Sequence, residues 1–304
     1  MKTTINHLSK MLLAFVLCAG LVMTSCETAD PVGNDKDPDN SENTGDTGNT
    51  GNTGDNNSSS DIIVFADDIV KKSCVDVFDT DGDGEISYGE AAAVKDLSNV
   101  SLRFLKDFLT FDEFQYFINV KSIPDKFFRG CKYLKSIMLP KSLNEIGEDA
   151  FYGCTGLTTI EFPEGLETIG KCAFSGCTGL TEVVFPERLE TIGESAFDGC
   201  TSLTKIEFPE GLETIGGHAF WQCTGLTEVV FPEGLETIGE YAFWECDGLT
   251  KIFSKPMTPP TCEDIILPFG LQKLRIYVPR ESVNLYKNAS SWNYYSDNIV
   301  GYDF

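Results

Sequence analysis

The sequence is poor in histidine and in positive charge, and both shortages narrow the range of functions. It holds only 2 histidines, His7 and His218, so histidine-based catalytic triads and multi-histidine metal sites have almost no material. Lysine and arginine number 23 against 47 aspartates and glutamates, for a formal net charge of −24. Phosphate backbones repel such a chain, so we expect no nucleic-acid partner.

An apolar run long enough to span a bilayer is also missing near the amino terminus. The apolar run 11–23 is too short for a membrane helix; it follows Lys2 and Lys10 in the order of a signal peptide. Small residues directly before Cys26 resemble the lipobox of bacterial lipoproteins, with Met23 where leucine is usual. The resemblance implies removal of residues 1–25 and acylation of Cys26. Ordinary cleavage beside an incidental cysteine is the alternative.

Residues 26–60 combine the anchor with a polar tether rich in aspartate, threonine, glycine and asparagine. No apolar periodicity is present to offset the entropy of ordering, so we expect this segment to be disordered. The acidic run after Cys26 resembles export signals of surface lipoproteins in the Bacteroides group. This implies a protein anchored in the outer membrane through lipid and exposed on the cell surface, although the anchor and tether also suit the periplasmic side.

Residues 79–90 have the spacing of a twelve-residue calcium loop. Carboxylates stand at positions 1, 3 and 5, glycine at position 6, and a glutamate at position 12, which suits a hard cation that needs several oxygens at one point. The segment resembles an EF-hand loop. The resemblance implies a backbone carbonyl ligand from position 7 and a direct or water-mediated one from position 9. The predicted Ca²⁺ ligands are Asp79, Asp81, Asp83, Glu85, Ser87 and Glu90.

Helical patterns flank this loop, so residues 61–110 are predicted to form a small helical cap. Ile69, Val70, Val75 and Phe78 give one apolar helical face before the loop, and 91–93 continue a helix after it. A lone extracellular site of this kind binds weakly, on the order of 0.1–1 mM, which favours a structural role. An acidic turn without metal is the alternative.

From Leu134 the chain repeats every 23 residues. In one repeat, Ile160 and Phe162 alternate with Glu161, which predicts a short strand, and Pro163 ends it. Later apolar positions fill a return path, Gly170 permits the next turn, and no single coil can bury this much apolar surface alone. We therefore predict a solenoid of stacked coils, rich in β-structure with short irregular or helical returns.

Six cysteines follow the same period of 23 residues. An even number of cysteines in a secreted protein invites a disulfide reading, but a strict ladder at one coil position favours buried free thiols that act as small hydrophobic residues. Cys172 and Cys262 fall outside the ladder. Its members are Cys131, Cys154, Cys177, Cys200, Cys223 and Cys246.

The repeated pattern Ile/Val-x-Phe-Pro-x-x-Leu-x-x-Ile-Gly-x-x-Ala-Phe-x-x-Cys resembles the BspA-type leucine-rich repeats of Bacteroides surface proteins. The resemblance places repeats at 111–252 and a carboxy-terminal cap at 253–304, and it includes a first coil with Thr110 and Glu113 as a capping box. Members of that family are surface proteins, some of them adhesins for host matrix proteins or other bacteria. The resemblance therefore implies a binding protein rather than an enzyme.

Comparison of the coils with one another locates a candidate ligand surface. Core positions agree between alternate coils, whereas most differences fall in one short loop. In the last two full coils that loop is expected to form an aromatic ridge, a suitable surface for sugar faces or protein hot spots. Packing of both tryptophans under the carboxy-terminal cap, near Trp292, is the alternative. The ridge residues are His218, Trp221, Tyr241 and Trp244.

Two other interpretations stay open. The predicted concave strand positions form a rival surface whose alternation of acidic and apolar residues suggests no particular ligand. A glycan-binding lipoprotein that assists polysaccharide capture, or a purely structural surface protein, is the alternative to a calcium-stabilised module that binds a host matrix or bacterial surface protein. The concave positions are Met138, Glu161, Val184, Glu207, Val230 and Phe253.

Overall fold

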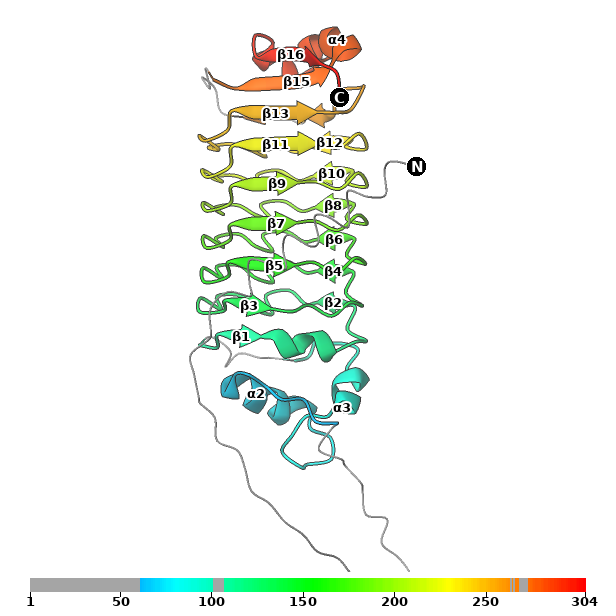
Figure 1. Cartoon of the computed structure of the whole chain (residues 1–304), viewed down its shortest axis with the longest axis vertical. Coiled ribbons are helices and arrows are strands. Elements are labelled where there is room, and N and C mark those ends of the chain that lie inside the picture. Colours follow the sequence, from blue (N-terminus) through cyan, green and yellow to red (C-terminus); the bar gives the residue numbers. More distant parts are fainter. Residues whose placement is uncertain (1–60, 101–106, 263, 265, 268–272) are drawn as a thin grey trace, which may run out of the picture. The chain divides into compact units, whose positions relative to one another are not determined.

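A computed structural model describes residues 61–100, 107–262, 264, 266–267 and 273–304 (Figure 1). The predicted signal peptide and tether, and the lipidation site Cys26, lie outside these residues. No helix within the described ranges has the length and apolar character needed to cross a membrane. The described part is a parallel β-solenoid of stacked 23-residue coils with a small helical cap before it, which confirms the predicted fold class.

Each coil contributes one strand to each of two parallel sheets (Figure 1). The larger sheet has the order β16-β15-β13-β11-β9-β7-β5, the smaller one β14-β12-β10-β8-β6-β4-β2, and β1 pairs with β3 separately. Strands of the larger sheet are β5 (Thr159–Glu161), β7 (Glu182–Val184), β9 (Lys205–Glu207), β11 (Glu228–Phe231), β13 (Lys251–Ser254), β15 (Arg275–Pro279) and β16 (Ile299–Tyr302). The remaining strands are β1 (Thr110–Phe111), β2 (Ser122–Ile123), β3 (Ser136–Ile137), β4 (Glu145–Ile146), β6 (Thr168–Ile169), β8 (Thr191–Ile192), β10 (Thr214–Ile215), β12 (Thr237–Ile238) and β14 (Thr261–Cys262).

The 23-residue period sets the register between neighbouring strands. Ile160 pairs with Val183 and Val183 with Ile206, so each strand meets its counterpart one period away. Outward positions of the larger sheet, here called the strand face, then form continuous rows. One such row alternates in charge from Glu182 to Lys251, and a second contains the predicted concave positions. The first row runs Thr159, Glu182, Lys205, Glu228, Lys251, Arg275.

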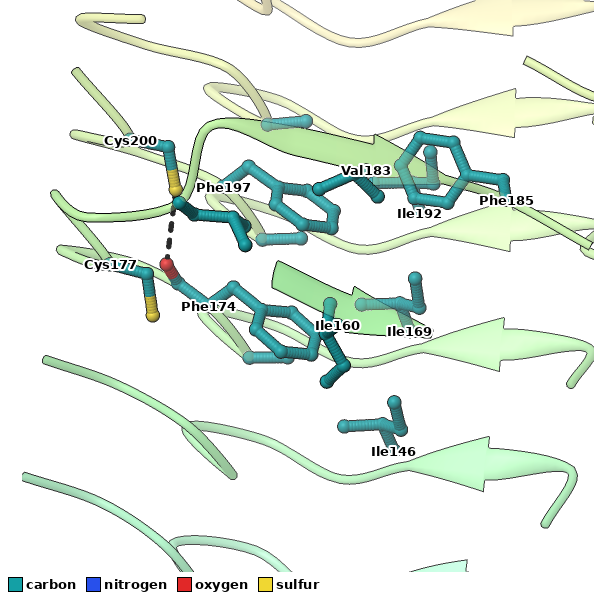
Figure 2. Close-up of a cluster of buried hydrophobic side chains, with 14 of the residues drawn as sticks. Ile146, Ile160, Ile169, Phe174, Cys177, Val183, Phe185, Ile192, Phe197 and Cys200 are labelled. Carbon is teal, nitrogen blue, oxygen red and sulfur yellow. Dashed lines mark hydrogen bonds between the residues drawn. The ribbon is translucent and has the colours of Figure 1, made fainter. Parts of the chain in front are cut away.

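Columns of identical side chains fill the interior (Figure 2). Phe174 and Phe197 stack with ring centroids 5.2 Å apart and planes within 7°, and this stacking recurs from Phe128 to Phe243. Adjacent strands in a sheet lie about 4.8 Å apart, so one ring per coil fills the column without a gap. The core is therefore a repeated layer, and each coil is stabilised by the coil above and the coil below.

The predicted free thiols are confirmed, and the structure adds a reason for their position. All cysteines within the described ranges are free, and the six ladder thiols are buried. The Cys200 thiol donates to the carbonyl oxygen of Phe174 in the preceding coil at 3.3 Å (Figure 2), and the same bond recurs in four other coils. Burial raises the pKa of Cys177 to about 12. These cysteines are hydrogen-bond donors as well as small apolar residues.

Gly170 has a different role from the one predicted. Its backbone is not left-handed; instead, a Cβ atom there would lie 2.8 Å from the Ile146 carbonyl oxygen of the preceding coil. Gly193 and Gly216 meet the same restriction one and two coils later. Close approach of two backbones, rather than a turn with positive φ, therefore requires glycine here.

The amino-terminal cap consists of α2 (Asp68–Phe78), the acidic loop and α3 (Tyr88–Ala93). Helix α2 buries Val70, Cys74 and Phe78, whereas Ile69 is exposed, so the predicted apolar face was wrong at Ile69. The face is shifted because 70, 74 and 78 are spaced by four residues and lie on one side of the helix. The rings of Phe78 and Phe117 then meet edge-to-face at 5.3 Å, which packs the cap on the first coil.

The predicted capping box of Thr110 and Glu113 is wrong. The 3₁₀ helix η1 (Asp112–Tyr116) begins without a side-chain cap, and the hydroxyl of Thr110 is buried without a hydrogen-bond partner. Glu113 Oε1 instead accepts the backbone N–H of Ala66 in the cap at 2.8 Å. A long-range bond replaces the local one because Glu113 is buried at the junction with the cap, where the Ala66 N–H needs an acceptor.

The carboxy-terminal end continues the larger sheet instead of covering it with a separate unit. Strands β15 and β16 pair in parallel with the strands before them. Between them run η2 (Arg280–Ser282), α4 (Val283–Asn288) and η3 (Trp292–Tyr295). Trp292 is fully buried, packs on Tyr286 at 5.0 Å, and donates its indole N–H to the Pro260 carbonyl at 2.9 Å.

Candidate functional site

The predicted ridge lies on the third side of the coils, between a strand of the smaller sheet and the next strand of the larger one. Here a ladder of backbone hydrogen bonds joins neighbouring coils: His218 N–H donates to Glu240 O at 2.8 Å, and Phe220 N–H to Ala242 O at 2.8 Å. Phe220 and Ala242 point into the core. His218 and Trp221 flank the buried pair Ala219 and Phe220 and are only half-buried, and Tyr241 and Trp244 hold the same places one coil further.

The structure brings the four ridge residues together. His218 stacks on Trp221 at 4.6 Å with planes within 12°. Tyr241 lies 5.4 Å from His218 and 6.2 Å from Trp221, and it meets Trp244 edge-to-face at 5.4 Å. All four side chains are half-buried. The ridge is one continuous aromatic surface, part of which faces solvent.

The backbone of the ridge differs from that of the earlier coils. His218 and Tyr241 have φ of 57° and 54°, as do the equivalent residues of other coils, so this part is a general property of the turn. Four residues later, earlier coils use Gly176 and Gly199 at positive φ, whereas the ridge coils use Gln222 and Glu245. A non-glycine residue there costs about 1–2 kcal/mol. Gln222 donates to Glu245 at 2.7 Å, which offsets part of that cost.

The third side changes character along the solenoid. At the positions equivalent to the ridge, the two coils before it carry Cys172, Ser175, Ser195 and Asp198, which are short side chains, and Ser175 is buried. Burial raises the pKa of Asp198, against the opposing effect of nearby His218.

A second set of large side chains precedes that short stretch, and sequence reasoning missed it. The Arg129 guanidinium lies 4.3 Å above the Tyr152 ring and pairs with Asp149. The same comparison between coils, extended two coils earlier, would have found it. Large side chains therefore occupy both ends of the third side, with short ones between them.

A second aromatic cluster lies at the carboxy-terminal end of the strand face, and the sequence pattern did not indicate it. Phe253 stacks on Tyr277 at 4.7 Å, and Tyr302 meets both rings edge-to-face at 5.5 Å. Phe304 packs on Tyr302 at 5.1 Å. Only Phe253 belongs to the predicted concave positions; Tyr277 and Tyr302 come from β15 and β16, outside the 23-residue repeat, and Phe304 follows β16. Alternation in 275–279 and 299–302 was the available signal.

The acidic loop partly fits a hard cation. Oxygen atoms of Asp79, Asp81 and Asp83 lie within 4.8 Å of one another, and Gly82 and Gly84 take positive φ between them. The Asp83 N–H lowers the pKa of Asp81, but partial desolvation and neighbouring negative charges outweigh it, so the pKa lies above its usual value. Three converging carboxylates, two of which help to raise the pKa of Asp81, are a suitable site for a divalent cation.

The other predicted ligands have different partners. Glu90 forms a capping box with Ser87 at the start of α3, and its Oε1 accepts from the N–H and hydroxyl of Thr80. Partial burial raises the pKa of Glu90, but these hydrogen bonds outweigh it and hold the pKa at about 2. The Glu85 side chain pairs with Lys71 at 2.7 Å, which leaves its backbone carbonyl as the predicted ligand. Glu90 is thus not part of the converging carboxylate group.

The repeat region matches a known sequence family. Residues 121–250 match six copies of the family described as BspA type leucine rich repeat region. No curated protein matches the chain.

Solved leucine-rich-repeat structures show limited similarity. A Treponema pallidum leucine rich repeat protein is 34% identical over 49% of this chain and 66% of its own, with a TM-score of 0.44. A Bacteroides ovatus leucine-rich repeat protein is 27% identical over 53% of both chains, with a TM-score of 0.36. A Faecalibacterium prausnitzii leucine rich cell surface protein is 24% identical over 54% of this chain and 60% of its own, with a TM-score of 0.37. The chain spans about half to two thirds of these structures.

Proposed function

We propose that this protein is a surface-displayed binding module that captures a protein partner through the ridge. One observation carries the proposal: four aromatic rings form a continuous, half-buried surface on two adjacent coils. Clustered aromatic side chains dominate protein interfaces because they bury large areas and lose little side-chain entropy. The replacement of glycine by Gln222 and Glu245 beside the ridge further distinguishes these coils.

The same surface supports a glycan as the second candidate. His218 and Trp221 lie almost parallel, and an aromatic face of this kind suits the apolar face of a sugar ring. A purely structural role is the third possibility, with the rings serving only to stabilise the last coils. Binding rather than catalysis is proposed because the ridge is an aromatic surface and not a set of converging acids or nucleophiles.

A binding screen of the purified protein, with Ca²⁺ present, tests these candidates. Extracellular-matrix proteins and glycans are the two arms, and the double variant Trp221→Ala, Trp244→Ala is run beside the wild type. Tyr152→Ala, an exposed aromatic on the same side of an early coil, is the matched control. We expect a protein hit that the double variant weakens at least tenfold, about 1.4 kcal/mol, and the control leaves unchanged.

The other outcomes separate the alternatives. A hit confined to glycans and lost in the double variant assigns the ridge to sugar. A hit that the double variant and the Tyr152→Ala control bind equally would mean that the site lies outside the ridge. If neither a matrix protein nor a glycan binds, and circular dichroism shows that each variant is folded, the structural role is the one supported.

We also propose that the protein is anchored to the outer membrane through acylated Cys26 and that Ca²⁺ stabilises the cap. The first proposal is supported by the sequence around Cys26, and the second by the convergence of Asp79, Asp81 and Asp83. In cells fed radiolabelled palmitate, the wild type is expected to take up label and Cys26→Ala is not. Label in the variant would contradict the anchor.

A further inference from the structure

A cavity of about 790 Å³ opens at the carboxy-terminal end of the solenoid, away from the ridge. Four segments enclose it: the turn between β11 and β12, the segment between β13 and β14, the residues around the end of β15, and the residues around the end of β16. The volume falls in the usual range of ligand sites, roughly 300–1,000 Å³. Neither the 23-residue period nor the ridge accounts for it.

One part of the cavity lining is apolar. Buried Leu235, Pro256 and Pro279 contribute to its lining, and exposed Tyr302 and Phe304 add aromatic surface continuous with the cluster on Phe253 and Tyr277. Proline has no backbone N–H, so these segments offer a surface with few donors. This part of the lining suits an apolar stretch of a ligand.

The rim of the cavity is negative. Glu233, Glu236 and Glu281 are exposed lining residues with no ion-pair partner in the described part of the chain. The cation in the lining, Lys255, is paired at 2.6 Å with Glu210, and Asp303 is paired with Arg280 at 2.8 Å. The three glutamates without an ion-pair partner are therefore exposed and accessible to a ligand.

Two rows of glutamates lead from the earlier coils to this rim. Their members recur every 23 residues, and the backbones of Glu190, Glu213 and Glu236 are linked coil to coil by hydrogen bonds. Arg188 pairs with Glu167 and Lys255 with Glu210, while the other members have no ion pair among the described residues. The rows are Glu164, Glu187, Glu210, Glu233 and Glu167, Glu190, Glu213, Glu236.

We propose that this cavity receives a lysine or arginine side chain from a basic segment of a partner protein. Such a side chain carries an apolar stem that matches the proline and aromatic lining and a cationic head that matches the rim. The glutamate rows extend the complementary charge for the neighbouring residues of that segment, and the net charge of −24 favours its approach. The cavity lies on residues separate from the ridge, so this proposal holds whether or not the ridge binds.

Fluorescence anisotropy with labelled octalysine, at low salt and again at about 0.15 M salt, tests the proposal on the full chain. The triple variant Glu233→Gln, Glu236→Gln, Glu281→Gln removes the rim charges. The control Glu145→Gln, Glu161→Gln, Glu182→Gln removes the same number of charges from exposed positions outside the cavity and outside both glutamate rows. We expect the rim variant to weaken binding about tenfold or more and the control less than about threefold.

A second probe separates the apolar lining from the charge. An octamer of 2,4-diaminobutyrate at pH 6.5 presents cationic heads on shorter stems. The wild type is expected to prefer octalysine several-fold, and Tyr302→Ala with Phe304→Ala is expected to reduce that preference. Equal loss in both triple variants, equal affinity for both octamers, or binding of a neutral oligosaccharide in place of octalysine would each overturn the proposal. Circular dichroism verifies that every variant is folded, and ridge variants leave octalysine binding unchanged.

Discussion

The two ends of the solenoid are closed in different ways. At the carboxy-terminal end the larger sheet continues into β15 and β16, and the buried hydroxyl of Tyr286 reaches Ser254 and the Pro256 carbonyl at 2.9 and 2.8 Å. At the amino-terminal end the helices α2 and α3 add no strand to either large sheet. Ring contacts and a few long-range hydrogen bonds hold them, such as Leu109 N–H to Asp67 at 3.0 Å.

This difference implies unequal stability. A cap whose backbone is part of the sheet can leave only with loss of ladder hydrogen bonds, whereas a docked helix pair can separate while the coils stay intact. Buried polar groups agree with this contrast. Thr110 Oγ1, Asp112 Oδ1 and Glu113 Oε2 lack partners near the amino-terminal junction. We therefore expect the amino-terminal cap to open first.

The largest expected effect is at the carboxy-terminal end. Trp292→Ala removes a fully buried ring and leaves the Pro260 carbonyl without its indole donor, so the free energy of unfolding should fall by about 3–5 kcal/mol. Denaturant titration followed by circular dichroism measures it, with exposed Leu285→Ala as control.

Phe78→Ala in α2 should instead expose the cap to protease with little change in the denaturant midpoint of the coils. If Phe78→Ala lowered the denaturant midpoint of the coils as much as Trp292→Ala does, the two ends would not differ in stability.

The next effect concerns the bond between Glu113 and the cap. Glu113→Ala leaves the Ala66 N–H without its acceptor, and docking of the cap should weaken by about 1–3 kcal/mol. Hydrogen exchange at Ala66 and along α2 should quicken, while exchange in β7 and β9 should not change. Exposed Glu164→Ala, far from the junction, is the control. Unchanged exchange at Ala66 would show that ring packing alone holds the cap.

Calcium should produce a smaller effect at the same end. For an affinity of about 0.1–1 mM, 2 mM Ca²⁺ stabilises the bound state by about 0.6–1.8 kcal/mol. Proteolysis and hydrogen exchange of α2 and α3 should slow relative to a chelator, and Asp79→Asn with Asp81→Asn should abolish the difference. The same concentration of Mg²⁺ serves as the control for ionic strength. If Ca²⁺ protected the double variant as much as the wild type, the effect of Ca²⁺ would not come from this loop.

The last test changes no residue and uses native cysteines as reporters of the opening of each end. Cys74 in α2 and Cys262 in β14 each have a pKa raised to about 12, in both cases mainly by burial. At pH 8 either thiol is protonated in the folded state and reacts only when its end opens. Peptide mapping after timed alkylation should show Cys74 labelled before Cys262, with half-buried Cys172 as a fast internal standard. The reverse order would contradict the proposed sequence of opening.

The periodic part of the molecule was predictable, and the ends were not. A strict 23-residue period gives the register, the phenylalanine column and the cysteine ladder, because every coil has the same neighbours. The same comparison between coils indicated that His218, Trp221, Tyr241 and Trp244 lie together, although it does not show what they bind. It also missed the pairing of Arg129 with Asp149, since the comparison began two coils after the coil of Arg129.

Contacts between distant segments could not be read from the sequence. Glu113 was assigned to a local capping box because the spacing fits, but its partner is Ala66, 47 residues away. The cavity joins Glu233 of the last full coil with Glu281 and Phe304, which follow the matched repeats and do not continue the repeat motif. Such contacts depend on how the tail of the chain returns to the last coils.

The alternation of charge across the strand face sets the step by which the solenoid can change length. Glu182, Lys205, Glu228 and Lys251 alternate, so the unit of repetition for this surface is two coils, or 46 residues. Deleting residues 180–225 would place Thr159 beside Glu228, as it now stands beside Glu182. Deleting 203–225 alone would set Glu182 beside Glu228. Gain or loss of coil pairs would therefore lengthen or shorten the molecule without adding like-charge neighbours to the single pair already present, Lys251 and Arg275.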